Sequence, residues 1–157
     1  MILLRRLFKK ASFFRLMSYY PPYFGAGIRI REVADDFSLI RVELAYHFWN
    51  RNYVGTQFGG SLYSMIDPLF MLMAMESLGR DYIVWDKAAT IRFIKPGRSR
   101  CLAELRIEPQ RLEEIRSEVK IRGKSNPVFQ VQIRDDQGQL IAEADKTLSV
   151  RLKKAGS

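Results

Sequence analysis

The chain has 157 residues, of which 47% are hydrophobic and 27% are charged, and this composition suits one globular domain with a sizeable core. Its one cysteine, Cys101, and its one histidine, His47, exclude a disulfide framework, a cysteine-based zinc site and a multi-histidine metal site. Because no internal disulfide can form, we expect a reducing, cytoplasmic environment and no bound metal.

The net charge of +9 is concentrated near the N-terminus. Residues 1–31 contain seven basic residues and no acidic one, whereas the other 126 residues contain 19 basic and 17 acidic residues. A nucleic-acid-binding domain usually spreads Lys and Arg along one face with aromatic residues between them, and no such stretch follows residue 31. We therefore expect no nucleic-acid partner.

Residues 1–20 are predicted to form an N-terminal amphipathic helix. Apolar residues recur there at helical spacing, with basic residues largely on the flanks; they are Leu4, Leu7, Phe8, Ala11 and Phe14. This stripe can pack on the chain's own domain, bind a membrane surface or a partner, or belong to a mitochondrial transit peptide. A secretory signal is not expected, because the longest uninterrupted apolar run covers only residues 1–4.

The following segment predicts a β-hairpin. Pro21-Pro22 are expected to end the N-terminal helix and to begin an extended stretch. Residues 28–33 alternate apolar and charged side chains, residues 38–44 are again rich in β-forming residues, and Asp35-Asp36 between them indicate a turn. Strands on either side of a short polar turn are expected to pair.

The middle of the chain predicts an aromatic loop and then a buried helix. Residues 46–58 combine aromatic and polar side chains and are expected to form a partly ordered loop. Residues 60–78 are apolar almost all round, which predicts a helix buried on most sides. Asp67, Pro68 and Glu76 interrupt this stretch, so we expect no membrane span.

The second half of the chain is predicted to form mainly antiparallel strands. Strands are predicted at 82–84, 88–94, 100–107, 127–134 and 139–151, and a short amphipathic helix at 110–121. Gly138 suits a left-handed position in the turn that joins the last two strands.

This order of elements predicts an α+β fold in which a curled antiparallel sheet wraps around one long central helix. Within it, the segments GTQFGGSLYSMIDP (residues 55–68) and TIRFIKPGR (residues 90–98) resemble the hotdog-fold thioesterases. The resemblance is to the branch described as tetrameric acyl-CoA thioesterases and as a domain of unknown function. It runs over residues 21–152, the expected hotdog domain, and follows the N-terminal helix of residues 1–20.

The resemblance implies hydrolysis of acyl thioesters such as acyl-CoA, with coenzyme A as part of the substrate and no separate cofactor. It also implies a homo-oligomer, a dimer or tetramer, with sites between subunits. Two other functions are considered. One is a non-catalytic acyl-CoA or lipid-binding protein of the same fold. The other is a membrane-surface or partner-docking protein that acts through residues 2–17.

Gly59 and Gly60 are the candidate oxyanion site. They let the backbone approach a ligand closely, and the first amides of a helix lack partners within it, so they can stabilise a thioester carbonyl that gains negative charge. The alternative is an ordinary strand-to-helix turn in which glycine avoids a clash.

Asp67 is the candidate catalytic acid. An unpaired carboxylate in so apolar a stretch costs several kcal/mol, so it must hydrogen-bond, find a cation or take up a proton. The resemblance implies that an acid at this spacing acts as general base or nucleophile. The alternative is a structural Asp that caps backbone freed by Pro68, which cannot donate to the carbonyl of Ser64.

Phe58 occupies the position before Gly-Gly, where better-known thioesterases of this fold often have a histidine. Phe58 can line an acyl pocket but cannot hydrogen-bond a carbonyl, so an orienting group must come from elsewhere. Asn52 is the first choice, with its role as a turn former as the alternative, and Gln57 and Ser64 are the other candidates.

Further contacts to substrate are expected from Met71 on the central helix, where the acyl tail is expected to bind, and from a basic turn. Lys95, Arg98 and Arg100 follow a strand and could pair with the phosphates of coenzyme A, although a solvated charged turn explains them equally well. His47 lies outside the His-Phe-Pro context of hotdog dehydratases, and we interpret it as a loop or core histidine.

Overall fold

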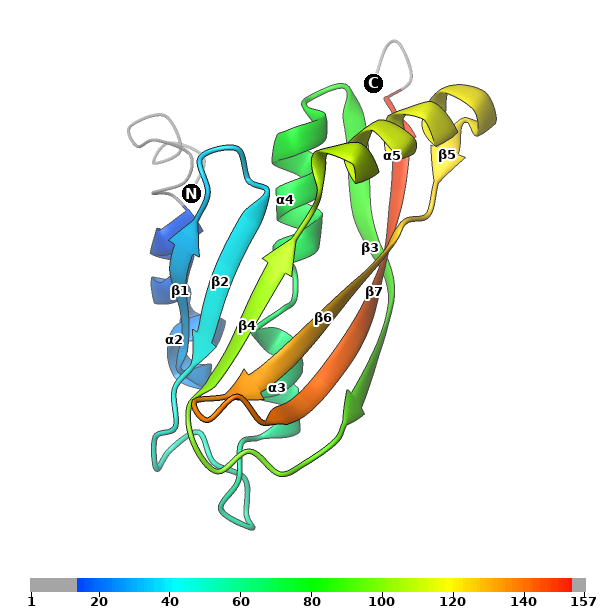
Figure 1. Ribbon diagram of the computed structural model, residues 1–157. Coiled ribbons are helices and arrows are strands. Elements are labelled where there is room, and N and C mark those ends of the chain that lie inside the picture. Colours follow the sequence, from blue (N-terminus) through cyan, green and yellow to red (C-terminus); the bar gives the residue numbers. More distant parts are fainter. Residues whose placement is uncertain (1–13, 154–157) are drawn as a thin grey trace.

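The computed structural model describes residues 14–153. In this part of the chain a seven-stranded antiparallel sheet has the order β1-β2-β4-β6-β7-β3, with a short β5 paired to β7. The strands are β1 Ile28–Val33, β2 Leu39–Leu44, β3 Tyr82–Phe93, β4 Cys101–Arg106, β5 Lys124–Ser125, β6 Val128–Asp135 and β7 Leu140–Leu152. The sheet curls around the central helical segments α3 and α4, while α5 crosses one end (Figure 1). The predicted hotdog architecture is confirmed.

The helices are the 3-10 turn η2 Met17–Tyr19, α2 Pro21–Ala26, α3 Gly59–Ser64, α4 Leu69–Leu78 and α5 Pro109–Arg122. The prediction that Pro21-Pro22 begin an extended segment was wrong, because both prolines lie in the first turn of α2. Proline suits that position, since the first helical amides have no partner within the helix. The helix ends at Gly27, whose φ of 77° is in the left-handed region.

The central helix is divided into two segments rather than continuous. α3 ends at Ser64 and α4 begins at Leu69, with turns between them. Pro68 lacks the N–H that would continue the helical hydrogen bonds to Ser64, which accounts for the break. Asp67 therefore lies at an interruption of the helix and not on a regular helical face.

The core lies between the helices and the concave face of the sheet. Phe70 of α4 stacks on Phe129 of β6 with ring centroids 5.0 Å apart, and Leu69, Met73 and Ala74 are fully buried beside it. Met75 is 41% exposed, so one side of α4 faces away from the sheet. Of the predicted N-terminal stripe, Phe14 alone lies within the described residues; it is buried, with its ring 5.1 Å from that of Phe37.

The strand β3 forms one edge of the sheet. The two strands predicted at 82–84 and 88–94 are one continuous strand, with an irregular register between Asp86 and Ala88. One side of β3 pairs with β7, and the other has no partner strand in the described part of the chain. A long stretch of unpaired backbone at a sheet edge is a surface on which another strand can pair.

Within residues 14–153, no helix is long and apolar enough to cross a bilayer.

Cys101 at the start of β4 is fully buried, and its surroundings disfavour the thiolate. Burial, together with the negative charges of Asp135 and Asp136, raises the pKa of the Cys101 thiol to about 12. We expect the native protein to react with a disulfide reagent such as Ellman's reagent at least about a hundredfold more slowly than the urea-unfolded chain, because the thiolate is the reactive form. A native rate close to the unfolded rate would contradict this burial.

Candidate active site

Asp67 lies where the central helix breaks, held by hydrogen bonds on its backbone and its side chain. The hydroxyl of Tyr23 donates to the Asp67 carbonyl oxygen at 2.6 Å, and the hydroxyl of Tyr63 donates to Asp67 Oδ1 at 3.0 Å. Tyr63 is in α3, four residues before Asp67, so its ring reaches the carboxylate from the preceding turn. The carboxylate is thus fixed in orientation.

A buried lysine forms an ion pair with this carboxylate. Lys146 of β7 has a side chain that is 2% exposed, and its Nζ donates to Asp67 Oδ1. The same Nζ lies 3.1 Å from Oδ1 of Asp86 on β3 and donates to the Tyr63 hydroxyl at 3.0 Å. We name these four residues, Tyr63, Asp67, Asp86 and Lys146, the acid–lysine cluster. It joins the helix break to two neighbouring strands of the sheet.

In the acid–lysine cluster, the pKa values of Lys146 and Asp86 depend on the neighbouring members of the cluster. Burial alone lowers the pKa of Lys146, but its hydrogen bonds to Asp67 and Tyr63 and its attraction to Asp67 outweigh this, so that the pKa lies above its ordinary value. Lys146 is therefore a permanent cation at neutral pH. Burial raises the pKa of Asp86, although Lys146 acts in the opposite direction. Two carboxyl groups thus share one ammonium group.

Asp67 keeps one oxygen free for chemistry. Both donors, Lys146 Nζ and the Tyr63 hydroxyl, bind Oδ1, and no donor to Oδ2 occurs among the described residues. The Asp67 side chain is 38% exposed, whereas Lys146 is almost fully buried. A carboxylate that is charge-compensated on one oxygen and open on the other can accept a proton from a water molecule or attack an electrophile.

Gly59 and Gly60 occupy the first turn of α3, as expected. α3 has no side-chain N-cap, and no acceptor for the amides of Gly59 and Gly60 is found among residues 14–153. Each glycine is also packed under an aromatic ring. A Cβ atom on Gly59 would lie 3.1 Å from the Phe93 ring, and one on Gly60 would lie 2.5 Å from the Phe58 ring. The packing favours glycine on steric grounds, while the amides remain available to an anion.

Asn52 braces its own loop. Its Oδ1 accepts from the amides of Val54 and Thr56 at 3.1 and 3.0 Å, and its Nδ2 donates to Thr56 Oγ1 at 2.8 Å. These contacts match the turn-forming role that we considered as the alternative. Gln57 is 3% exposed and its Nε2 donates to the carbonyl oxygens of Ala45 and Ser99, so it ties the loop to the sheet.

Within the described residues, no hydrogen bond joins Ser64 or Phe58 to Asp67. Ser64 Oγ donates to the carbonyl oxygen of Gly60 at 2.8 Å, one turn back in the same helix. Phe58 is 56% exposed, with its ring over Gly60, and Met71 is half-buried on α4 against the core. Phe58 remains a candidate wall for an acyl group beside the glycine pair.

The basic turn after β3 is exposed. Lys95 Nζ donates to Gln139 Oε1 at 3.2 Å, Arg100 lies 3.7 Å from Glu43, and Arg98 has no ion-pair partner among the described residues. His47 lies in the loop between β2 and α3, half-buried, with its ring stacked at 4.2 Å on Trp49. His47 is a loop histidine, and it makes no contact with the acid–lysine cluster in this structure.

Sequence reasoning missed Tyr63, Asp86 and Lys146. A usable signal exists for Lys146: in β7 the inward positions are Ala144, Lys146, Leu148 and Val150, so a lysine stands in phase with apolar core residues. A lysine at an inward-facing position of a strand needs a counter-ion in the core. The nearby apolar helix offers Asp67 for this purpose, but only the fold brings the two together.

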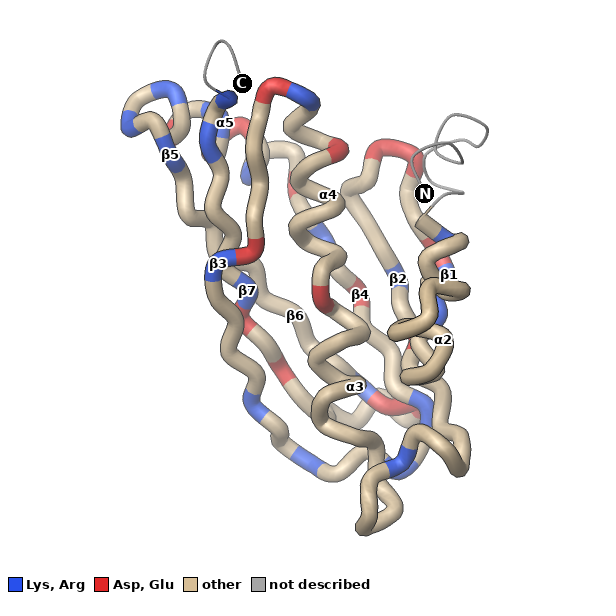
Figure 2. The backbone as a smooth tube through the Cα atoms, turned by 180° about the vertical axis from the view of Figure 1, so that it is seen from behind, with Lys and Arg blue, Asp and Glu red and all other residues tan. Residues whose placement is uncertain are grey.

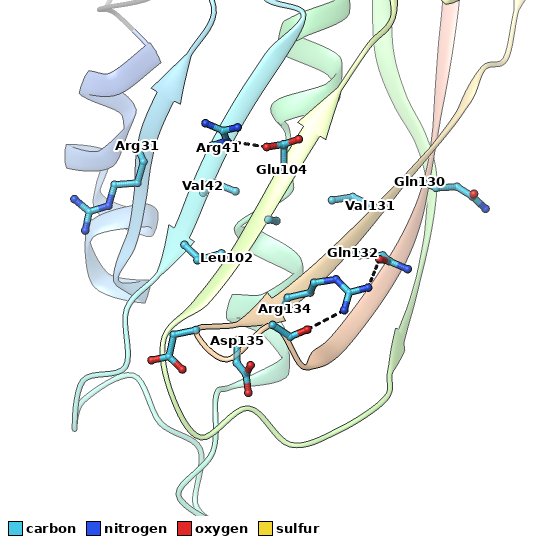
Figure 3. Close-up of a pocket in the computed structure, with 13 residues that line it drawn as sticks. Arg31, Arg41, Val42, Leu102, Glu104, Gln130, Val131, Gln132, Arg134 and Asp135 are labelled. Atoms are coloured by element: carbon cyan, nitrogen blue, oxygen red, sulfur yellow. Dashed lines mark hydrogen bonds and ion pairs between the residues drawn. The ribbon is translucent and has the colours of Figure 1, made fainter.

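A separate pocket of about 710 Å³ opens on the outer face of the sheet (Figure 3). It exists because β4 and β6 pair only over Cys101–Ala103 and then diverge. Its charged side chains already have partners, such as Arg41 with Glu104 and Arg134 with Gln132. None of its lining residues belongs to the acid–lysine cluster, so this pocket is not the candidate site.

Comparison with known proteins agrees with this architecture. A probable thioesterase of unknown function from Pseudomonas aeruginosa superposes with a TM-score of 0.79 at 20% identity, covering 90% of this chain and 95% of that one. A thioesterase from Haemophilus influenzae has a TM-score of 0.67 at 17% identity, with 92% of each chain covered. At these identities the likeness establishes the hotdog fold.

Sequence comparison gives the family. No curated protein matches the chain at a significant level. A family model described as a domain of unknown function, DUF4442, matches residues 9–150. This match covers nearly the whole chain, including the Gly-Gly turn, Asp67 and Lys146. The chain therefore belongs to the DUF4442 family and has the fold of the hotdog thioesterases.

Proposed function

We propose that this protein hydrolyses acyl thioesters, with acyl-CoA as the substrate class and Asp67 as the catalytic carboxylate. The observation that carries the proposal is the state of Asp67: Oδ1 is held by Lys146 and Tyr63, while Oδ2 is open on a partly exposed side chain. An open carboxylate oxygen on a partly exposed side chain is the group that a general base needs. The thioesterase names of the structural neighbours agree with this proposal.

In the proposed reaction Asp67 acts as a general base. Oδ2 accepts a proton from water while the water oxygen bonds to the thioester carbonyl carbon, and the carbonyl electrons move onto oxygen. The amides of Gly59 and Gly60 donate to this oxyanion. The oxyanion then re-forms the carbonyl, the C–S bond breaks, and the thiolate takes the proton from Asp67. The products are a carboxylic acid, which ionises, and free thiol.

Lys146 and Asp86 are proposed as positioning residues, since they act through Asp67. Lys146 compensates the charge of Asp67 and fixes Oδ1, and Asp86 holds the second side of the ammonium group. The acyl tail is proposed to lie along the exposed side of α4 near Met71, beyond Phe58. Lys95, Arg98 and Arg100, all exposed after β3, are candidates to bind the coenzyme A phosphates.

The unpaired edge of β3 supports a homodimer in which two sheets become continuous. Ala88, Ala89 and Thr90 are exposed there, and Asp86 of the acid–lysine cluster lies on the same strand. Pairing along this edge would bring a second copy beside Phe93 and Gly59, because Phe93 packs against Gly59. The proposed active site is then completed by the partner subunit.

The test is release of free thiol from short-, medium- and long-chain acyl-CoAs. We expect turnover by the wild type and a loss of about 10²–10⁴-fold in kcat for Asp67→Asn, because the amide cannot accept the proton. Asp81→Asn, a change at an exposed aspartate before β3, serves as the matched control and should retain wild-type activity. Circular dichroism and gel filtration confirm that all three proteins fold and assemble alike.

The same assay separates the alternatives. Full activity of Asp67→Asn would remove Asp67 from the mechanism. If no protein turns over any thioester but isothermal titration shows binding of acyl-CoA, the chain is a non-catalytic acyl-CoA-binding protein, as the phenylalanine before the glycine pair allows.

A further inference from the structure

One end of the molecule presents large apolar side chains to solvent. In the loop between β2 and α3, Phe48 is 82% exposed, Trp49 57%, Tyr53 105% and Val54 70%. We name these four residues the aromatic tip. The loop protrudes beyond the ends of the strands, at the bottom of Figure 1. Four neighbouring large apolar side chains exposed in this way indicate a surface that contacts another molecule or a membrane.

The loop holds these rings out on a fixed scaffold. Asn50 is buried, with Nδ2 donating to the carbonyl oxygens of Ala26 and Ala45 and Oδ1 accepting from the His47 amide. Tyr46 donates its hydroxyl to the Gly55 carbonyl at 2.6 Å, which closes the loop across its base. The aromatic tip is therefore exposed on a loop whose backbone is held in place by these hydrogen bonds.

A basic groove borders the aromatic tip. It has a volume of about 450 Å³, and its lining includes Arg15, Arg29, Phe24 and Trp49. Phe24 is 70% exposed. Arg15 and Arg29 have no ion-pair partner among the described residues, and neither does Arg51 of the loop, whose guanidinium lies over the Tyr46 ring at 4.0 Å. The groove thus offers cations beside apolar rings.

The two segments that form this end of the molecule carry only positive charges. Residues 14–31 and 45–60 contain four basic residues and no acidic one. Asp35, Asp36 and Asp81 lie in turns at the opposite end. Figure 2 shows Lys and Arg on the loops beside the tip, together with the acidic β6–β7 turn of Asp135 and Asp136, whose Asp136 accepts from the Ser99 hydroxyl. A lipid headgroup region favours aromatic residues next to arginines, because the rings of Trp, Tyr and Phe enter the interface and the Arg cations bind phosphates.

We propose that the aromatic tip and the adjoining basic groove dock on the surface of an anionic lipid membrane. Phe48, Trp49, Tyr53 and Val54 insert among the headgroups, and Arg15, Arg29 and Arg51 bind lipid phosphates. An acidic protein partner could use the cations, but it would not need four apolar side chains projecting from a convex loop. The proposal concerns binding and does not depend on the proposed thioesterase activity.

The two tryptophans of the chain provide the test. Trp85→Phe leaves Trp49 as the single reporter on the tip, and Trp49→Phe leaves Trp85, which is 65% exposed on β3 toward the other end of the strand. With full-length protein and mixed phosphatidylcholine–phosphatidylglycerol vesicles, Trp49 emission should shift to the blue and be quenched by brominated acyl chains. Trp85 emission should show neither change.

Vesicle sedimentation gives the second measurement. Phe48→Ser/Trp49→Ser/Tyr53→Ser should lower the partition coefficient about tenfold or more, whereas Ile121→Ser, which changes an 80% exposed residue on α5, should leave it unchanged. Binding should weaken with added salt and on pure phosphatidylcholine, because the arginines supply part of the attraction. The three serine changes affect exposed side chains and should leave the fold intact by circular dichroism.

Three results would overturn the proposal. The first is no sedimentation with anionic vesicles at low salt. The second is sedimentation without any change in Trp49 emission, which would assign binding to another part of the chain. The third is a blue shift of Trp49 that grows with protein concentration in the absence of vesicles and is not increased by them, which would mean that a second protein molecule covers the tip.

Discussion

Lys146→Met is expected to lower both the free energy of unfolding and kcat. The change removes the cation that Asp67 and Asp86 share and leaves two carboxyl groups facing an apolar side chain. Breaking a buried ion pair by deleting one partner costs about 3–5 kcal/mol, and the partial exposure of both aspartates places the expected loss near 2–3 kcal/mol. Urea denaturation measures this loss.

The effect on turnover follows from the position of Asp67. Without Lys146, Oδ1 keeps only the hydroxyl of Tyr63 as a donor, so the carboxylate is free to rotate. A misplaced base costs about 10²-fold in rate. We expect kcat to fall by about that factor while KM changes little, because the Lys146 side chain is almost fully buried and is not among the proposed substrate contacts.

Lys120→Met is the matched control. Lys120 is an exposed lysine on α5 rather than on the proposed dimer edge, and its loss should change stability and kcat only slightly. A second check is the triple variant Asp67→Asn/Asp86→Asn/Lys146→Met, which removes all three charges. It should be more stable than Lys146→Met alone, because no uncompensated carboxylate remains. If it is less stable, the lysine acts through packing rather than charge.

The pKa shifts of Lys146 and Asp86 determine how the stability of the wild type and of Lys146→Met changes with pH. The fold raises the pKa of Lys146 above its ordinary 10.5, so its stabilisation is complete at neutral pH and is lost only as pH rises into strong alkali. The fold also raises the pKa of Asp86, so this group favours the folded state most at acid pH and less as pH rises past 3.8. The deficit of Lys146→Met relative to the wild type should therefore shrink as pH falls.

Ala88→Lys/Ala89→Lys is expected to convert a dimer into monomers. Both alanines are exposed on β3, whose outer edge has no partner strand within residues 14–153. Two lysines beside Lys87 would place like charges against their copies in an antiparallel pairing, which is destabilising. We expect the wild type to elute as a dimer or larger oligomer with a mass that light scattering confirms, and the double variant to elute as a monomer.

Thiol release by the double variant tests whether the site is shared. If a second copy completes the site beside Phe93 and Gly59, activity should fall by at least about tenfold while the circular dichroism spectrum stays native. If the double variant remains a dimer, the two copies pair along another surface. A fully active monomer would contradict an intersubunit site.

Much of the fold follows from local patterns of the sequence. Alternation of apolar and charged residues located β1 and β2, and the apolar run located the central helix, because a sheet face and a helix stripe repeat with different periods. The same patterns failed at Pro21-Pro22. Two consecutive prolines suit either an extended segment or the first turn of a helix, and packing of Tyr23 into the core decides between them.

By itself the sequence determined the hotdog architecture, the Gly-Gly turn and the presence of an acid in an apolar stretch. Only the tertiary structure decided what surrounds that acid, because Asp67, Asp86 and Lys146 are far apart in the chain and meet only where β3 and β7 pass the helix break. It also decided that Asn52 braces a loop, since a hydrogen bond depends on which partners lie within reach. Local periodicity fixes which face of an element is buried, but packing alone fixes which side chains meet there.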